Sequence, residues 1–249
     1  AAKMPMVSYC SSAPTLTGSG KYFFRDYPSD AFQGKFAAEY LYNKLGARKV
    51  AIMYHISDYG TGIKTVFAAR FTELGGQIVA EEGLPQEARD YKAEITKIKA
   101  SAPDYVYSAM YPDGGIVFIN QLSQIAGDLK VFGSDGWGDI KFQKEVSGKA
   151  DIMVSTAKTA VTDEFTAKMQ AKNAGEQVPV CSPQAYDAFN IIVNAIAKAG
   201  TNPDKLTSEL HKTDYQGVSG KITFDEKGDL PTAEYIVKRI ENGGSVEVK

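Results

Sequence analysis

The chain of 249 residues is 43% hydrophobic and 23% charged, proportions typical of globular proteins that exclude a disordered chain or a coiled coil. Its 28 basic and 30 acidic residues give a net charge of −2 without a basic stretch, so we expect no nucleic-acid partner. No apolar run approaches the roughly 20 residues that cross a bilayer, and the start lacks a signal-peptide pattern, which favours a mature or partial chain.

The first element is a short strand that ends at Ser8 and runs into a hydroxyl-rich loop, residues 8–17. In an open α/β protein, loops at the carboxyl ends of strands are where ligands bind. The alternative is an ordinary surface turn rich in Ser and Thr.

Strands and helices alternate evenly from residue 49 to residue 155. Expected strands are 49–54, 77–80, 104–108, 129–133 and 152–155, and expected helices are 60–74, 91–100, 115–126 and 140–146. One helix between successive strands requires parallel pairing and right-handed crossovers. The pattern therefore predicts an α/β fold with a doubly wound parallel sheet.

The rest of the chain departs from this alternation. A helix is expected over 182–199, with Ser182 as its cap and Pro183 in its first turn, and a second over 203–211. A strand at 220–224 and a hairpin over 233–248 complete the chain.

In a parallel sheet the strand-end loops locate a binding site without any motif. They are His55–Tyr59, Ala109–Asp113 and Ser134–Trp137, which bring tyrosines, carboxylates and the single Trp to one edge. Aromatic rings beside an acid suit a small ligand that carries an ammonium group. The alternative is that Asp135 caps the next helix and Trp137 packs against that helix.

No catalytic, metal or cofactor motif is visible. Two cysteines, Cys10 and Cys181, and two histidines, His55 and His211, give no metal-ligand spacing, and a disulfide between the cysteines cannot be deduced. The segment Gly18–Lys21 resembles a phosphate loop, but Tyr22 stands where Ser or Thr must hold the metal. A nucleophilic Ser would have only His55 as a base, and no G-x-S-x-G is present.

A series of short matches along the whole chain resembles one known family, the type I periplasmic solute-binding proteins of ABC importers, in the leucine/isoleucine/valine-binding branch. In chain order the matching segments are Ser8–Pro14, Leu16–Thr17, Phe24–Arg25, Pro28–Asp30, Gln33–Gly34, Val50–Ile52, Asp58–Gly60, Gly75–Gly76, Pro103–Asp104, Gly133–Gly136, Tyr186–Ala188, Ala199–Gly200, Gly220–Lys221, Phe224–Asp225 and Gly228–Asp229.

The resemblance implies a periplasmic-binding-protein-like type I fold of two doubly wound parallel-sheet lobes joined by three crossovers. Residues 29–156 and 233–249 would form a complete second lobe, and residues 1–28 and 157–232 a partial first lobe. Hinges are expected near 28–29, 159–162 and 230–232. Because the family has further βα units ahead of this start, we expect the first lobe to expose apolar surface unless a removed segment or an oligomer covers it.

The resemblance also implies a ligand site for an amino acid enclosed between the lobes. Cys10, Ser11 and Ser12 match the loop that holds the α-carboxylate and ammonium, with Ser12 supplying a hydroxyl. Asp135 matches the acid that pairs with the ammonium. Tyr59 and Tyr111 match the facing wall, and Cys181 falls near a position that touches the ligand side chain. Cys10 stands where a small Ser or Ala is common, so the pocket floor is expected to differ.

The function expected from this resemblance is capture of a branched-chain or other small amino acid for an ABC permease in the membrane. No enzyme activity, cofactor or metal is expected. The location would be periplasmic or otherwise extracytoplasmic, with a lipoprotein-anchored form as a variant. The alternatives are a ligand-sensing domain of the same fold in a receptor or regulator, and a hydrolase or sugar-modifying enzyme.

Overall fold

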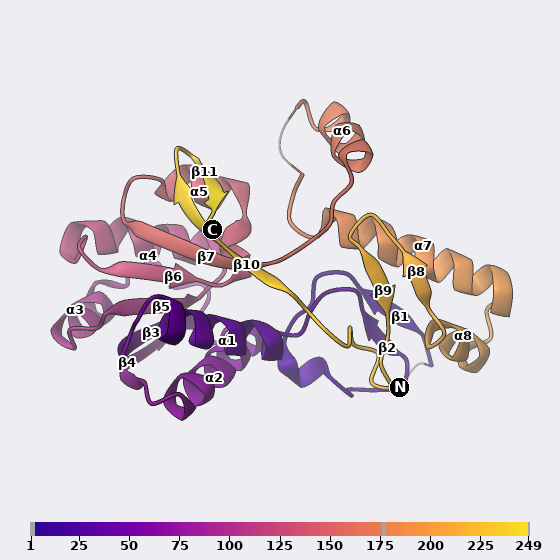
Figure 1. Ribbon diagram of the computed structural model, residues 1–249, viewed down its shortest axis with the longest axis horizontal. Coiled ribbons are helices and arrows are strands. Elements are labelled where there is room, and N and C mark those ends of the chain that lie inside the picture. The colour runs from indigo at the N-terminus through magenta and orange to yellow at the C-terminus, as the bar shows by residue number, and fades with distance from the viewer. Residues whose placement is uncertain (1–2, 176–177, 249) are drawn as a thin grey trace. The chain divides into compact units, whose positions relative to one another are not determined.

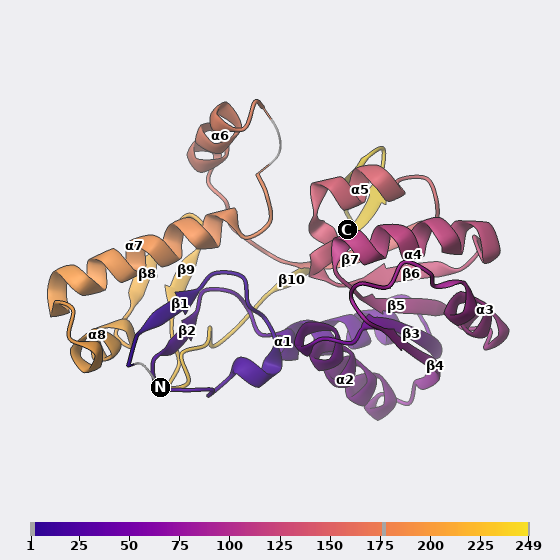
Figure 2. The same cartoon turned by 180° about the vertical axis from the view of Figure 1, so that it is seen from behind.

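The computed structural model describes residues 3–175 and 178–248, which divide into two compact units (Figures 1 and 2). Unit 1 comprises Ala1–Ser29 and Lys158–Ala233, and unit 2 comprises Asp30–Ala157 and Glu234–Lys249. The chain passes from one unit to the other after residues 29, 157 and 233. Each unit is described by itself below.

Unit 2 is built on a mostly parallel sheet that has seven strands within the described residues. The strands are β3 (Lys49–His55), β4 (Gln77–Leu84), β5 (Tyr105–Ala109), β6 (Lys130–Gly133), β7 (Asp151–Ala157), β10 (Tyr235–Glu241) and β11 (Gly244–Glu247). Their order in the sheet is β11-β10-β7-β6-β5-β3-β4. Strands β3 to β7 pair in parallel, while β10 pairs antiparallel with both β7 and β11.

The five parallel strands confirm the doubly wound sheet. Strand β4 lies on one side of β3, whereas β5, β6 and β7 follow on the other side. The direction of winding therefore reverses between β3 and β5. In open α/β sheets the crevice at such a reversal, outside the carboxyl ends of the strands, is where ligands bind.

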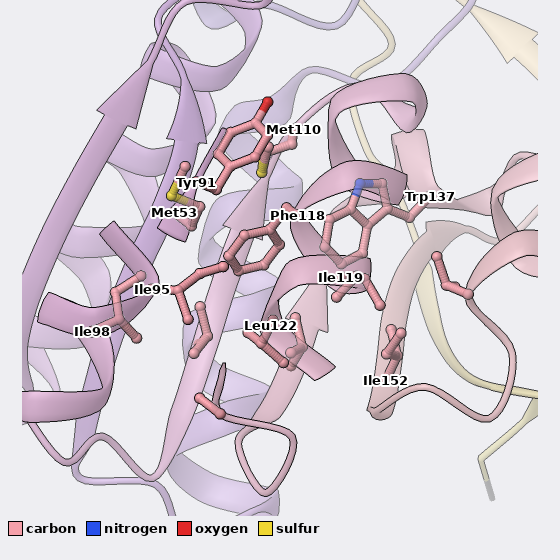
Figure 3. Close-up of a cluster of buried hydrophobic side chains, with 14 of the residues drawn as sticks. Met53, Tyr91, Ile95, Ile98, Met110, Phe118, Ile119, Leu122, Trp137 and Ile152 are labelled. Atoms are coloured by element: carbon pink, nitrogen blue, oxygen red, sulfur yellow. The ribbon is translucent and has the colours of Figure 1, made fainter. Parts of the chain in front are cut away.

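Helices cover both faces of this sheet (Figure 1). They are α1 (Asp30–Glu39), which continues into a π-helical turn (Tyr40–Lys44), α2 (Asp58–Glu73), α3 (Lys92–Ala100), α4 (Pro112–Ile125) and α5 (Ile140–Val146). Alternate residues of a strand point to opposite faces. Thus Val50 and Ile52 of β3 pack with α1 and α2, while Ala51 and Met53 pack with α3 and α4. Figure 3 shows the second of these cores, in which Phe118, Ile119 and Leu122 of α4 lie against the sheet.

Unit 1 contains shorter pieces of sheet. Its elements are β1 (Met6–Ser8), a 3₁₀ turn (Pro14–Leu16), β2 (Phe23–Arg25), α6 (Asp163–Lys172), α7 (Ser182–Ala199), α8 (Pro203–Leu210), β8 (Asp214–Gln216) and β9 (Lys221–Thr223). Strands β1 and β2 are parallel, and β8 and β9 form an antiparallel pair. Val7, Phe24, Ile191, Leu210 and Ile222 belong to its apolar core.

Several of these elements differ from the sequence expectation. Helix α7 begins at Ser182 as predicted, but its N-cap is Cys181, which has φ 65° and makes no side-chain capping bond. Helices α1 and α6 and strands β2 and β8 had no predicted counterpart. Helix α1 buries small residues such as Gly34, Ala37 and Ala38, so its sequence carries almost no apolar periodicity.

Helix α7 carries an exposed apolar stripe on the face opposite the unit 1 core. Tyr186, Phe189, Val193 and Ile196 recur at helical spacing and are 51, 67, 45 and 37% exposed. The expectation of exposed apolar surface on this part of the chain is therefore met on α7. No helix among the described residues is long and apolar enough to span a bilayer.

Candidate functional site

Three of the predicted site residues meet at the carboxyl ends of the parallel strands of unit 2. Tyr59 lies in the first turn of α2 after β3, Tyr111 is the residue before α4 after β5, and Asp135 follows β6. Because β3 and β5 flank the reversal in winding, Tyr59 and Tyr111 arise on its two sides. Their rings lie 5.1 Å apart, centroid to centroid, at 31°.

The turn that presents Tyr59 is fixed by two local features. The Ser57 hydroxyl caps α2 by accepting a 3.1 Å hydrogen bond from the Gly60 amide. A Cβ at Gly60 would lie 2.2 Å from the His55 carbonyl oxygen and 2.9 Å from that of Ala109. Only glycine therefore allows this turn to sit directly on the ends of β3 and β5.

The Tyr59 hydroxyl ties α2 to the loop after β6. It lies 2.8 Å from Asp135 Oδ1 and 2.7 Å from Ser134 Oγ, and it is 3.4 Å from the Gly136 amide, which donates to it. Burial, followed by the negative charges of Asp135 and Asp30, raises the pKa of the Tyr59 phenol well above its ordinary value. The phenol therefore stays protonated and can donate to the Asp135 carboxylate.

The alternatives for Asp135 and Trp137 resolve differently. Helix α5 is capped by Asp139, whose side chain accepts from the Phe142 amide at 2.8 Å, so Asp135 is not the cap. Trp137 is fully buried and stacks on Phe142 with ring centroids 4.5 Å apart. The structure thus places the Trp137 indole in the core of unit 2 (Figure 3), where it follows the packing alternative and leaves no surface for a ligand.

The predicted site residues of unit 1 lie around one disulfide. Cys10 and Cys181 are joined across 171 residues of sequence, with their Cα atoms 5.7 Å apart. The bond ties the loop after β1 to the N-cap of α7. Ser11, in the same loop, donates its amide to Ser8 Oγ at 3.3 Å, and Ser12 is buried.

A buried ion pair holds the other end of this loop. The Arg25 guanidinium, which is fully buried, contacts both carboxylate oxygens of Asp229, at 2.7 Å from Nε and 2.8 Å from Nη2. It also donates to the Ala13 carbonyl at 3.0 Å and to Thr17 Oγ1 at 2.7 Å. The loop from residue 8 to residue 17 is therefore anchored by the disulfide near its start and by Arg25 near its end.

Sequence reasoning assigned no site role to Ser134, Arg25 or Asp229, although all three stand in the segments that carry the family resemblance. It placed His55 in the strand-end loop 55–59 and named it as a potential base. His55 is fully buried, and both ring nitrogens have partners: Nδ1 accepts from the Tyr111 amide at 3.0 Å and Nε2 lies 3.3 Å from the Tyr91 hydroxyl. Both ring nitrogens are therefore engaged by groups within unit 2.

No metal centre is apparent in the part of the chain that the structure describes, where His, Cys, Asp and Glu form no group of three or more able to hold an ion. The side chains gathered in unit 2 instead offer one carboxylate beside two aromatic rings. This set can bind a cationic head group by a charge-assisted hydrogen bond and by contact with the ring faces.

The comparison with protein families matches residues 1–245 to the model described as periplasmic binding protein. A curated relative, the leucine-, isoleucine-, valine-, threonine- and alanine-binding protein of Pseudomonas aeruginosa, is 28% identical over 244 residues. That alignment covers 93% of this chain and 64% of the relative, so the chain spans less than two thirds of that protein's length.

Solved structures give the same picture. The leucine-binding protein LivK of Thermotoga maritima superposes with a TM-score of 0.91 and 26% identity, covering 99% of this chain and 73% of that one. LivJ of Streptococcus pneumoniae, a branched-chain amino acid transporter substrate-binding protein solved with isoleucine, gives 0.85 and 26% over the same shares. The mixed α/β architecture of this chain is thus the architecture of these proteins.

Proposed function

Since this chain belongs to the periplasmic binding protein family, we propose that it is the substrate-binding component of an ABC importer and captures a branched-chain or other small amino acid. The P. aeruginosa relative binds leucine, isoleucine, valine, threonine and alanine by its name, and the S. pneumoniae structure contains isoleucine. Delivery to a membrane permease follows from the same role.

The observation that carries this proposal is the Tyr59–Asp135 pair beside Tyr111. The Asp135 carboxylate accepts from the Tyr59 phenol, and in the proposed role it pairs with the ligand's ammonium. The rings of Tyr59 and Tyr111 would contact the ligand's carbon skeleton. Trp137 acts behind them, by filling the core beneath the Asp135 loop.

Unit 1 would supply contacts to the ligand's carboxylate. Ser12 offers a hydroxyl and Cys10 a backbone amide, in a loop that is held at both ends. Ser11, whose own amide donates to Ser8 Oγ, stands between them. Cys181, at the N-cap of α7, would contact the ligand's side chain. The three chain passages after residues 29, 157 and 233 would act as the hinges for binding and release.

An extracytoplasmic location is part of the proposal. Disulfides persist in oxidising compartments and are rare in the cytosol, so the Cys10–Cys181 bond supports this location. A lipid-anchored form would serve the same role. The family consists of binding proteins, and we propose that the amino acid leaves this chain chemically unchanged.

Calorimetric titration of the chain with L-leucine, L-isoleucine, L-valine, L-threonine and L-alanine tests the function. We expect saturable binding of at least one of them, and recovery of the same compound by mass spectrometry. Asp135→Asn removes the charge but keeps the shape, and should weaken binding by about 2–5 kcal/mol. Asp113→Asn, an exposed carboxylate after the neighbouring strand, is the matched control and should bind as the wild type does.

Two results would contradict the proposal. If the folded chain bound none of the five amino acids, the proposal that it captures amino acids would be wrong. If Asp135→Asn bound the ligand as tightly as the wild type does, Asp135 would not be the partner of the ammonium.

A further inference from the structure

A chain of hydrogen bonds leads from the interior of unit 2 to Tyr111. The Tyr91 hydroxyl donates to the Ala88 carbonyl at 3.1 Å and lies 3.3 Å from His55 Nε2. His55 Nδ1 in turn accepts the Tyr111 amide at 3.0 Å. Four residues from the β4–α3 loop, β3 and the start of α4 are therefore linked in series.

The donors in this chain allow one protonation state of His55. A backbone N–H can only donate, so Nδ1 must be the unprotonated acceptor. A neutral imidazole then carries its proton on Nε2, facing Tyr91. The Tyr91 hydroxyl donates its hydrogen bond to the Ala88 carbonyl, and its oxygen can accept from His55 Nε2, so every donor has an acceptor.

Packing prevents the imidazole from turning away from this arrangement. His55 is fully buried, and Gly114, in the first turn of α4, lies directly against it. A Cβ at Gly114 would stand 2.4 Å from His55 Nε2 and 2.8 Å from the Tyr91 hydroxyl oxygen. The absence of a side chain at Gly114 thus lets the helix start rest on the His55–Tyr91 pair.

Tyr91 is itself fastened to α4. Gln121 of that helix accepts the Tyr91 amide at 2.7 Å and donates to the Arg89 carbonyl at 3.0 Å. The loop that carries Tyr91 and the helix that follows Tyr111 are consequently held together at two places, by Gln121 and by His55.

The rings continue the series outward from His55. The imidazole stacks on Tyr111 with centroids 5.8 Å apart at 29°, and Tyr111 lies 5.1 Å from Tyr59, which contacts Asp135. We propose that His55 is a positioning residue: its neutral ring, oriented by Tyr91, fixes the backbone of Tyr111 and so the aromatic wall beside Asp135. This inference rests on the proposed function for its ligand, but its structural part does not.

Two isosteric variants test it. In His55→Asn the side-chain oxygen takes the place of Nδ1 and keeps an acceptor for Tyr111, whereas in His55→Gln the amide takes the place of Nε2 and that acceptor is lost. We expect His55→Gln to weaken L-leucine binding about tenfold or more, the equivalent of one lost hydrogen bond, and His55→Asn to stay close to wild type. The control is His211→Asn, which changes the second histidine of the chain, located in unit 1, and should leave L-leucine binding unchanged.

Hydrogen exchange of the Tyr111 amide, followed by NMR, gives a readout that needs no ligand. We expect slow exchange in the wild type and in His55→Asn, and faster exchange in His55→Gln and, to a smaller degree, in Tyr91→Phe. Unchanged exchange at Tyr111 in His55→Gln would overturn the inference whatever the chain binds. Failure of the wild-type chain to bind any of the five amino acids would instead count against the proposed function, and the exchange result would still decide the role of His55.

Should the exchange data agree while both His55 variants bind L-leucine as tightly as the wild type does, His55 would be a packing residue without influence on the ligand. That outcome also overturns the proposal.

Discussion

Cys10 and Cys181, 171 residues apart, form a disulfide that ties the loop after β1 to the N-cap residue of α7. Such a bond restricts the unfolded chain over a long loop, and removal of a native disulfide typically costs about 2–5 kcal/mol of stability. We therefore expect the double variant Cys10→Ser, Cys181→Ser to unfold at lower denaturant concentration than the wild type. Addition of dithiothreitol should lower the wild-type midpoint but leave the double variant unchanged; a wild-type midpoint insensitive to full reduction would contradict this.

The buried pair of Arg25 and Asp229 gives a second prediction. Asp229→Asn leaves a fully buried guanidinium without its charged partner, which should cost about 3–5 kcal/mol. Equilibrium urea unfolding measures this. The exposed pair Lys21–Asp204 is the control, since side chains that are 64 and 58% exposed are screened by water and Asp204→Asn should change the midpoint little. Similar midpoints for the two variants would show that Arg25 finds another partner.

Asp26 predicts an unusual dependence of stability on pH. Burial, followed by the charge of Asp187, raises its pKa from 3.8 to about 8, and one carboxylate oxygen has no hydrogen-bond partner among the described residues. Between these two pH values the folded chain holds a proton that the unfolded chain has lost. The contribution of Asp26 to stability therefore falls with rising pH, by about 1.4 kcal/mol per pH unit at most.

Asp26→Asn should remove this penalty. We expect the variant to be more stable than the wild type at pH 7, with a difference that shrinks toward pH 4, as measured by urea unfolding at several pH values. Asp128 is exposed, so the control variant Asp128→Asn should show no such trend. A variant that is less stable than wild type at pH 7 would mean that Asp26 is ionised and paired.

His55 predicts a dependence of the opposite sign. Burial, followed by the charge of Arg89, lowers its pKa from 6.5 to about 4, with Glu87 acting weakly in the other direction. Below pH 6.5 His55 is protonated in the unfolded chain, whereas in the folded chain it stays neutral down to about pH 4. Stability should fall as the pH drops through this range, by up to about 1.4 kcal/mol per unit, and His55→Asn should reduce the slope. An identical slope of stability against pH in that variant would mean that other groups cause the loss of stability in acid.

The apolar stripe on α7 predicts association. Large apolar side chains gathered on one exposed face favour contact with another surface, and Phe189 is 67% exposed. We expect sedimentation of the chain to depend on concentration and Phe189→Glu to abolish this dependence without loss of stability. Asn194→Glu, at an exposed site outside the stripe, should behave as the wild type does. A wild-type chain that sediments as a monomer at all concentrations would contradict the prediction.

The parallel sheet of unit 2 was predictable because its information is local. Each strand from β3 to β6 is an expected strand followed by an expected helix, and β7 is one more expected strand. Parallel pairing and the edge that carries Tyr59, Tyr111 and Asp135 follow from this alternation. Helix α1 was not predictable, because its buried face combines the polar Asp30 and Gln33 with small residues. One of these, Gly34, lies so close to Ile63 and Val66 of α2 that a Cβ would meet them at about 3 Å.

Other parts of the candidate site depend on contacts that no local pattern encodes. The pairing of Cys10 with Cys181 and of Arg25 with Asp229 joins residues 171 and 204 positions apart. Trp137 could equally face a ligand or the core, and the glycines at 115 and 133 decide the outcome, since a Cβ at either would lie within 2.4 Å of the indole. Space left by a glycine in α4 and another at the end of β6 thus determines where the indole lies.

In unit 2 the residues proposed to meet the ligand lie apart from those that form the core. Tyr59, Tyr111 and Asp135 each stand within four residues of the end of a strand, while the apolar residues that hold the sheet lie further back along β3, β5 and β6. Exchange of a few loop residues can therefore alter which compound is held without disturbing the core. The His55–Tyr91 pair lies at the boundary between these two parts, because it links the end of β3 to the loop ahead of α3.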